Sequence, residues 1–211
     1  MEDKKLDSNI GESDTIEKDK VLLKRSWSFW ENYESKIKDA LSYSDSVKEI
    51  YTFDNIIEFW QFWNKYPGND TKEIFFNGEC IKYFFKEKYR ISAMNFFEKG
   101  IKPEWEDEKN KKGNILTLGY VIEDKDINKF LSMINEKWIK LIFLVIGETL
   151  PYSNNINGIR FVDKTKLVKN KSIIFKFEIW VNRFMKIEEL NEIKKYLTNE
   201  FGCSGTIKPI Q

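Results

Sequence analysis

The residue types most suggestive of chemistry lie in one short loop, Glu104–Glu108, with the sequence EWEDE. Trp105 stands in polar surroundings, and Glu106 supplies a carboxylate that can accept hydrogen bonds from two adjacent N–H donors, such as guanine N1–H and N2–H₂. Two other interpretations stay open: a solvated acidic loop with Trp105 folded back on the protein, and a carboxylate metal site. The metal site is disfavoured because three consecutive acidic residues alternate in direction and do not converge on one ion.

A second candidate is the basic segment from Arg160 to Lys176, which contains six positive residues and one negative residue, Asp163. Ammonium groups neutralise phosphate oxygens, so a phosphate-binding site is one interpretation. The segment also contains aliphatic and aromatic residues, so it is not a simple charged tail. The alternative is a solvated hairpin loop, which is the usual place of a charged run.

Aromatic residues make up 16% of the chain, and seven of them are tryptophans. Tryptophans lie more often in a core or an interface than under a ligand, and this is the expectation for Trp27, Trp30, Trp60, Trp63 and Trp138. Trp60 falls where the outer face of a helix is expected, and an exposed tryptophan there is typical of a binding hot spot.

Composition excludes several classes of function. The chain has 211 residues with 35 basic and 34 acidic ones, so any contact with nucleic acid must be local rather than made by bulk charge. It contains no histidine, which removes Ser-His-Asp and Cys-His triads and histidine-based zinc sites. Its two cysteines, Cys80 and Cys203, indicate a reducing compartment rather than a disulfide framework. With no apolar run of membrane-spanning length and no signal-peptide core, the chain is expected to be soluble and intracellular.

The chain is predicted to form one domain with a tail. Residues 1–20 carry seven acidic and four basic residues and few apolar ones, which predicts a flexible acidic N-terminal tail. No internal repeat and no further shift in composition follow, so residues 21–211 are predicted to be a single domain.

Helical spacing of apolar residues predicts three helices, over 53–63, 126–146 and 187–201. Asp54 or Thr52 can cap the first helix, while Gly147 and Gly202 stand where the second and third would end. The first helix stops before the breakers at positions 67 and 68.

Strands are predicted over 25–33, 89–97, 115–122, 159–162 and 172–181. In the last of these, alternation puts Lys176, Glu178 and Trp180 on the face opposite to the apolar side chains. Strands that follow one another without regular βαβ alternation predict an α+β fold with an antiparallel sheet. Three helices can cover only one face of that sheet, which leaves the other face for solvent or a ligand.

Residues 100–113, GIKPEWEDEKNKKG, resemble the G-I-x-P-x-W-E-D-x-x-N pattern of the mRNA cap-binding translation initiation factor 4E family nearly letter for letter. Further matches are Trp27 and Trp30, FDNIIEFWQFWN (53–64), WIKLIFLVIGE (138–148) and KFEIW (176–180), in the family's order over about 21–201. The resemblance implies a strongly curved antiparallel sheet of about eight strands, with three helices on the convex face. It also implies a site for 7-methylguanosine triphosphate on the concave face.

The resemblance also implies roles for single residues at the cap base. Trp105 would stack on the methylated base, whose positive charge favours aromatic rings, and Glu106 would accept its N–H groups. Trp180 would contact the methyl group. The second stacking ring falls on Tyr43, ten residues before Phe53, where most members of the family have tryptophan. Tyr33 is a weaker alternative for that ring.

For the triphosphate, the resemblance implies Lys176, four residues before Trp180, and a second cation near Lys164. The hairpin that contains Lys164 is longer than is usual in the family. The alternatives for the second phosphate contact are therefore Lys166, Lys169 and Lys171.

On the convex side, the family docks a Tyr-x4-Leu-Φ helix from an initiation factor 4G-type scaffold or from a competing 4E-binding repressor. The residues that match this apolar docking site are Ile56, Trp60, Ile139, Phe143 and Gly147. Lys140 stands where the family commonly has an acidic residue, and Phe143 where it commonly has leucine, so partner choice is expected to be altered.

The leading hypothesis is therefore a non-enzymatic protein that binds capped mRNA and recruits it to the translation initiation machinery. A repressor paralogue that holds caps without engaging the scaffold is the alternative, and a metal-dependent cap or nucleotide hydrolase is a remote one. The expectations that go with the hypothesis are a monomer without cofactor, metal or membrane contact. The expected location is the cytoplasm, with the nucleus as a second compartment.

Overall fold

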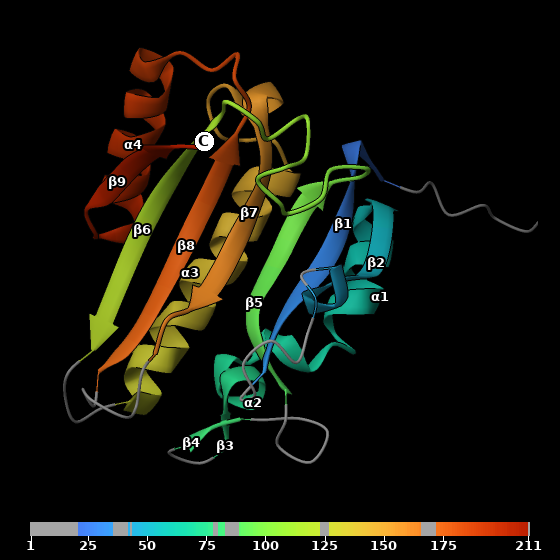
Figure 1. The fold of residues 1–211 in the computed structure, drawn as a ribbon, viewed down its shortest axis with the longest axis vertical. Coiled ribbons are helices and arrows are strands. Elements are labelled where there is room, and N and C mark those ends of the chain that lie inside the picture. The colour runs from blue at the N-terminus through green and yellow to red at the C-terminus, as the bar shows by residue number, and fades with distance from the viewer. Residues whose placement is uncertain are drawn as a thin grey trace, which may run out of the picture.

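A computed structural model describes residues 21–35, 42, 44–77, 80–82, 89–122, 127–165 and 172–210. The predicted tail over residues 1–20, Tyr43, and the alternative phosphate ligands Lys166, Lys169 and Lys171 lie outside these residues. Within them the chain has a helical layer on one face of a large antiparallel sheet (Figure 1). The predicted α+β class is confirmed.

Seven strands form the main sheet, in the order β2-β1-β5-β7-β8-β6-β9, and every neighbouring pair is antiparallel. Their bounds are β1 Leu22–Ser35, β2 Val47–Asn55, β5 Tyr89–Glu98, β6 Asn114–Ile122, β7 Ile156–Asp163, β8 Ile173–Val181 and β9 Gly205–Pro209. The short strands β3 (Phe76–Asn77) and β4 (Cys80–Ile81) pair separately. The main sheet therefore has seven strands, close to the eight expected.

Three helices of eight residues or more lie behind the sheet: α1 (Ile56–Trp63), α3 (Ile127–Ile146) and α4 (Ile187–Phe201) (Figure 1). A short helix, α2 (Thr71–Phe75), and single 3-10 turns at Ser44–Ser46, Pro67–Asn69 and Ser153–Asn155 complete the described elements. Buried residues of α1, α3 and α4 belong to one hydrophobic cluster together with one face of the sheet. The core therefore sits between the helices and the convex face, as predicted.

The start of the first helix differs from the prediction. Residues 53–55 belong to β2, because Phe53 pairs with Trp27 of β1 and is buried in the sheet. The helix begins at Ile56, and its cap is Asn55, whose side chain accepts the backbone N–H of Glu58 at 2.9 Å. Neither Asp54 nor Thr52 caps it.

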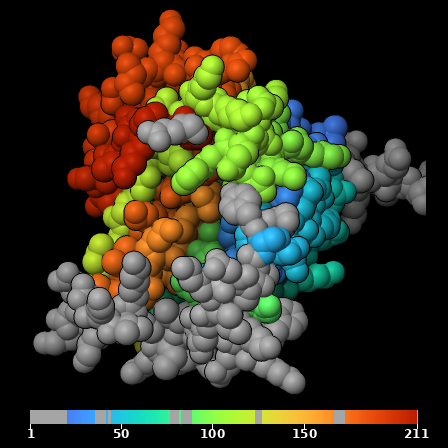
Figure 2. All heavy atoms as spheres, in the orientation of Figure 1, coloured from blue at the N-terminus to red at the C-terminus, as the bar shows by residue number. Residues whose placement is uncertain are grey.

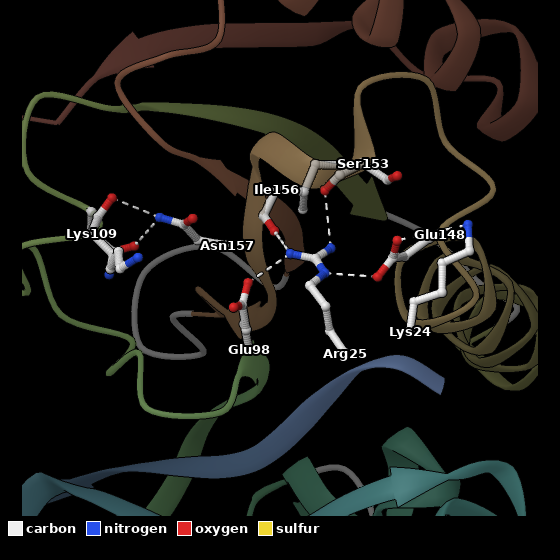
Figure 3. A network of polar contacts seen from close by, with 9 residues as sticks. Lys24, Arg25, Glu98, Lys109, Glu148, Ser153, Ile156 and Asn157 are labelled. Atoms are coloured by element: carbon white, nitrogen blue, oxygen red, sulfur yellow. Dashed lines mark hydrogen bonds and ion pairs between the residues drawn. The ribbon is translucent and has the colours of Figure 1, made fainter. Parts of the chain in front are cut away.

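Helix α3 ends at Ile146, directly before Gly147, as predicted, but the residue in the left-handed conformation is Glu148, with φ of 52°. Glu148 turns its carboxylate to Arg25 of β1, with 2.8 Å between Nε and Oε1 (Figure 3). The same guanidinium donates to Glu98 and to the carbonyl oxygens of Ser153 and Ile156. This contact set ties α3, β1, β5 and the start of β7 together, which explains why the left-handed residue is an acid.

Candidate functional site

The loop over residues 99–113 leaves β5 and reaches β6 by crossing the ends of β7 and β8, which lie between them in the sheet (Figure 1). Its shape is fixed from within. The Asp107 carboxylate accepts the backbone N–H groups of Lys102 and Lys109, each at 2.9 Å. Asn110 is fully buried and donates its amide to the carbonyl oxygens of Lys102 and Glu104, each at 2.8 Å. Asp107 and Asn110 of the E-D-x-x-N sequence therefore hold the shape of the loop.

The loop is also fastened to the sheet. The Asn157 amide of β7 donates to the Lys109 carbonyl oxygen at 2.8 Å and to Asn110 Oδ1 at 2.9 Å (Figure 3). Ile101 is buried in a second, smaller cluster with Trp180 and other apolar residues of the concave side. At Gly113 the chain passes so close to β8 that a Cβ atom would lie 2.0 Å from the Val181 carbonyl oxygen. The loop is therefore held rigidly at the top of the concave face.

This frame presents Trp105 and Glu106 to solvent. The Trp105 side chain is 58% exposed, and Glu106 is exposed beside it. Together with Lys111 and Lys112 they line a surface hollow of about 270 Å³. Figure 2 shows the loop, in yellow-green, standing out over this side of the molecule. Trp105 is not folded back into a core, so the solvated-loop interpretation with a buried Trp105 is wrong.

The predicted second stacking ring is not placed by the structure, because Tyr43 is outside the described residues. The weaker alternative, Tyr33, lies elsewhere, and so does Trp27, the other aromatic ring of β1 that could serve. Tyr33 packs against the main core and its hydroxyl donates to Glu31, which also accepts the hydroxyl of Tyr66. Trp27 is fully buried in the same core. Neither ring lines the hollow beside Trp105.

The concave face of β5, β7 and β8 carries a polar network. The sheet register places Asn95, Arg160 and Glu178 side by side on three neighbouring strands. Arg160 Nε donates to Asn95 Oδ1 at 2.8 Å, and its terminal nitrogen lies 3.3 Å from Glu178 Oε2. Trp180 donates its indole N–H to the same Glu178 oxygen at 3.2 Å. Glu178 and Trp180 thus lie on the face of β8 that alternation predicted, and Asn95 and Arg160 lie beside them on the neighbouring strands.

Trp180 is placed at the predicted face but is fully buried there. Phe97 packs edge-on against it at 5.6 Å, and the Arg160 guanidinium lies 5.3 Å over its ring. A ligand's methyl group would therefore reach Trp180 only after neighbouring side chains move.

The predicted phosphate cations lie toward the lower end of this face. Lys176 of β8 is half-buried, pairs across the sheet with Val162, and shares the face of Arg160. In an antiparallel pair, diagonal neighbours such as Arg160 and Lys176 have Cα atoms roughly 7–8 Å apart. Lys164 is exposed just beyond β7, and its backbone N–H donates to the Ile174 carbonyl oxygen at 2.8 Å.

Arg160 was not singled out as a site residue from the sequence. It was counted only as one of the six positive residues of a basic segment. Alternation along β7 puts Arg160 on the same face as residues 158 and 162, but the pairing of these residues with Trp180 and Lys176 is visible only in the sheet register. The single acid of the segment, Asp163, is buried and bound to Arg90 at 2.6 Å, so it does not neutralise these cations.

The predicted docking residues gather on the opposite, helical side. Trp60 of α1 is 40% exposed and Phe143 of α3 is 36% exposed, with 5.5 Å between their ring centroids. Ile56 and Ile139 are partly buried beside the core. Gly147 is exposed, and a Cβ atom there would lie 2.7 Å from the Phe143 carbonyl oxygen, so this close approach requires glycine.

We refer to Ile56, Trp60, Ile139, Phe143 and Gly147 as the helical-side patch. Lys140, next to this patch, forms an ion pair with Glu200 of α4. The ammonium that replaces the family's usual acid therefore already has a partner within the chain.

The three consecutive acids of the loop diverge. Asp107 turns inward, Glu106 faces solvent, and Glu108 pairs with Lys111, whose hydrogen bond and charge lower the pKa of Glu108. Within the described residues, no group of three or more His, Cys, Asp or Glu side chains could hold a metal ion. None of the helices in that part of the chain is both long and apolar enough to cross a membrane.

The described residues thus form an α+β domain with a seven-stranded antiparallel sheet, helices on one face, and an exposed Trp-Glu pair on a rigid loop over the other. The model of the family described as eukaryotic initiation factor 4E matches residues 22–208. The chain belongs to that family, as the sequence resemblance indicated.

Relatives and solved structures of the same family are similar over most of the chain. An isoform 4E from Solanum lycopersicum is 24% identical over 152 residues, which cover 72% of this chain and 64% of the relative. The Dictyostelium discoideum factor 4E is 28% identical over 137 residues, 65% of this chain and 45% of the relative. The chain thus spans about half to two thirds of these relatives' lengths.

Two solved structures show the same fold. Ascaris suum eIF4E-3 in complex with m7G cap has a TM-score of 0.64 at 19% identity, covering 91% of this chain and 92% of the other. A schistosome eIF4E complexed with m7GpppA and 4E-BP also has a TM-score of 0.64, at 18% identity, covering 90% and 88%. At this level of identity, the likeness concerns the fold.

Proposed function

We propose that this protein binds the 7-methylguanosine cap of mRNA over its concave face and recruits capped mRNA to the translation initiation machinery. The observation that carries the proposal is the Trp105–Glu106 pair, exposed side by side on a loop that Asp107 and Asn110 lock from within. A rigid frame lowers the entropy lost on binding, because the two recognition groups are already ordered before the ligand arrives.

The chemistry of the pair suits a methylated guanine. Methylation at N7 makes the base cationic, so an indole face attracts it by stacking and by cation–π interaction. The Glu106 carboxylate accepts N1–H and N2–H₂ with charge assistance from the cationic base. Tyr43 is the proposed second ring, and Trp180 the proposed contact of the methyl group.

The triphosphate would extend over β7 and β8 toward Lys176, with Lys164 at the far end. We add Arg160 to this set, because its guanidinium lies on the same face one diagonal step from Lys176. Guanidinium and ammonium groups are the usual partners of phosphate oxygens. The protein's own residues thus supply an aromatic and acidic end for the base and a basic end for the phosphates.

For recruitment, we propose that the helical-side patch docks a Tyr-x4-Leu-Φ helix from a 4G-type scaffold or a 4E-binding repressor. The partly exposed Trp60 and Phe143, in contact with each other, give this patch the aromatic centre of a binding hot spot. Lys140 supports the alternative of a repressor paralogue that holds caps without the usual scaffold, because it stands where the family commonly has an acidic residue and is paired with Glu200.

The proposal is tested by titrating the tryptophan fluorescence of the full chain with 7-methyl-GTP and with GTP. We expect binding of the methylated nucleotide to be much tighter, because only its base carries the positive charge. Equal affinities would contradict cap recognition. Pulldown with a Tyr-x4-Leu-Φ peptide separates the scaffold-binding role from the repressor role. Incubation with a cap dinucleotide and Mg²⁺, followed by a search for turnover, tests the remote hydrolase alternative.

A further inference from the structure

Glu178 of β8 pairs across the sheet with Arg160 and lies two residues from Lys176 on the same face, beside two of the cations of the proposed phosphate end. We infer that Glu178 acts as a built-in competitor of the ligand's phosphates: it occupies Arg160 and thereby sets the strength and the salt dependence of phosphate binding. This inference rests on the proposed function and deepens it, because it names a residue that tunes that site.

Arg160 is held on both sides. Asn95, which is fully buried, accepts from Nε at 2.8 Å and is itself fixed because its amide donates to the Asn32 side chain at 2.7 Å. Glu178 approaches the other end of the guanidinium, and both members of the pair keep about one sixth of their side chains exposed, 16% and 15%. The guanidinium is thus ordered on the concave face and still reachable from solvent.

The contact with Glu178 is the longer of the two. Its 3.3 Å separation is longer than the roughly 2.7–2.9 Å of a good charge-assisted hydrogen bond. The same oxygen also accepts the Trp180 indole N–H at 3.2 Å, so one carboxylate oxygen serves two long contacts. A phosphate oxygen could offer Arg160 a shorter and better aligned bond, while Trp180 would keep Glu178 in place.

Replacing Glu178 by a phosphate at Arg160 is opposed by electrostatic repulsion. Arg160 and Lys176 carry two positive charges on this face, and Glu178 cancels one of them. A phosphate that approaches Arg160 therefore meets a carboxylate already bound there, and the two anions repel at short range. The charges of Arg160, Lys176 and Glu178 act on the triphosphate and not on the base. Glu178 should therefore affect only the binding of ligands that carry phosphates.

The test is Glu178→Gln in the full chain. Glutamine keeps an oxygen that can accept the Trp180 N–H but removes the negative charge. We expect binding of 7-methyl-GTP to tighten by about threefold or more at low salt and to depend more steeply on salt. Binding of 7-methylguanosine, which has no phosphate, should be unchanged. Glu136→Gln on the exposed side of α3 changes the net charge equally on the opposite side of the sheet, and it should have no effect.

A purely structural role for Glu178 predicts a different pattern: lower thermal stability and equal weakening of both ligands, which would overturn the inference. Glu178→Asp keeps the charge and should keep the wild-type salt dependence even if it destabilises the fold. In an Arg160→Gln background, Glu178→Gln should bring a smaller gain than in the wild type, and an undiminished gain would show that Glu178 does not act through Arg160. Failure of the wild type to prefer 7-methyl-GTP over GTP would contradict the proposed function itself, whereas normal preference without a gain in Glu178→Gln would contradict only this inference.

Discussion

Neighbouring residues of β8 show how differently the two faces of the sheet are built. Phe175, Phe177 and Ile179 are fully buried against the helices, in the main core. Lys176 and Glu178, between them in sequence, are half-buried on the concave side, and Glu178 contacts Arg160 there. Along β8 the convex face packs into the main core, whereas the concave face also carries charged side chains. Stability and phosphate binding should therefore be separable by single substitutions.

The largest effect is expected from Phe177→Ala, which removes a ring that lies 5.1 Å from Phe161 and 5.5 Å from Trp138. Such a cavity in an aromatic core typically costs about 3–5 kcal/mol of the free energy of unfolding. Urea denaturation monitored by circular dichroism measures it. Lys176→Ala, one residue away, is the matched control and should change stability by about 0.5 kcal/mol or less. Similar losses in both variants would contradict the division between the faces.

Trp60→Ala tests whether the helical-side patch works independently of the concave face. Trp60 is partly exposed, so the variant should fold, but it removes the aromatic centre of the patch. We expect loss of about 2 kcal/mol or more of binding energy for a Tyr-x4-Leu-Φ peptide, measured by calorimetry. Affinity for 7-methyl-GTP should stay nearly intact. Loss of cap binding with the peptide affinity preserved would reverse the assignment of the two faces.

Trp105→Ala is the reciprocal change. Stacking on one base contributes about 1–3 kcal/mol, so 7-methyl-GTP binding should weaken about tenfold or more, with peptide binding unchanged. Tyr43→Ala should cost less, because phenol offers a smaller face and a weaker cation–π partner than indole. Tyr43→Trp should hold or raise the affinity. If Tyr43→Ala binds the cap like the wild type, then Tyr43 is not the second ring.

Local patterns predicted the parts of the fold that local physics decides. Helix α4 has the predicted bounds, with Gly202 in the left-handed conformation at its end, because periodicity and a glycine cap are both visible in the sequence. The alternation along β8 was also correct. The edge strands β2 and β9 were not predicted, since exposed positions interrupt their apolar pattern.

What failed depends on contacts between distant segments. Residues 53–55 fit a helical pattern, but pairing with β1 draws them into the sheet. The left-handed Glu148 at the end of α3 is explained only by Arg25, 123 residues away in sequence. In the site, the Trp-Glu loop was recognised from its sequence, whereas the Arg160–Glu178 contact follows from strand register, which no local pattern reveals.

The smallest expected effects concern the lysines of the proposed phosphate end, first Lys176 and then Lys164. The Lys176 side chain is half-buried on the face of Arg160, and its ammonium would meet the triphosphate from the side opposite to the Trp105 loop. Because the Debye length is about 8 Å at physiological ionic strength, salt screens such contacts, and 7-methyl-GTP binding should weaken as salt is added. Binding of 7-methylguanosine should barely respond. Lys176→Ala should flatten the salt dependence of 7-methyl-GTP binding while leaving the affinity for 7-methylguanosine unchanged, as fluorescence titrations across a salt series would measure.

Lys164→Ala is the matched comparison at the exposed end of β7, where free rotation in water makes the contact weaker and the change in slope smaller. Equal salt slopes for the wild type and Lys176→Ala would remove Lys176 from the site and shift the phosphates toward Arg160.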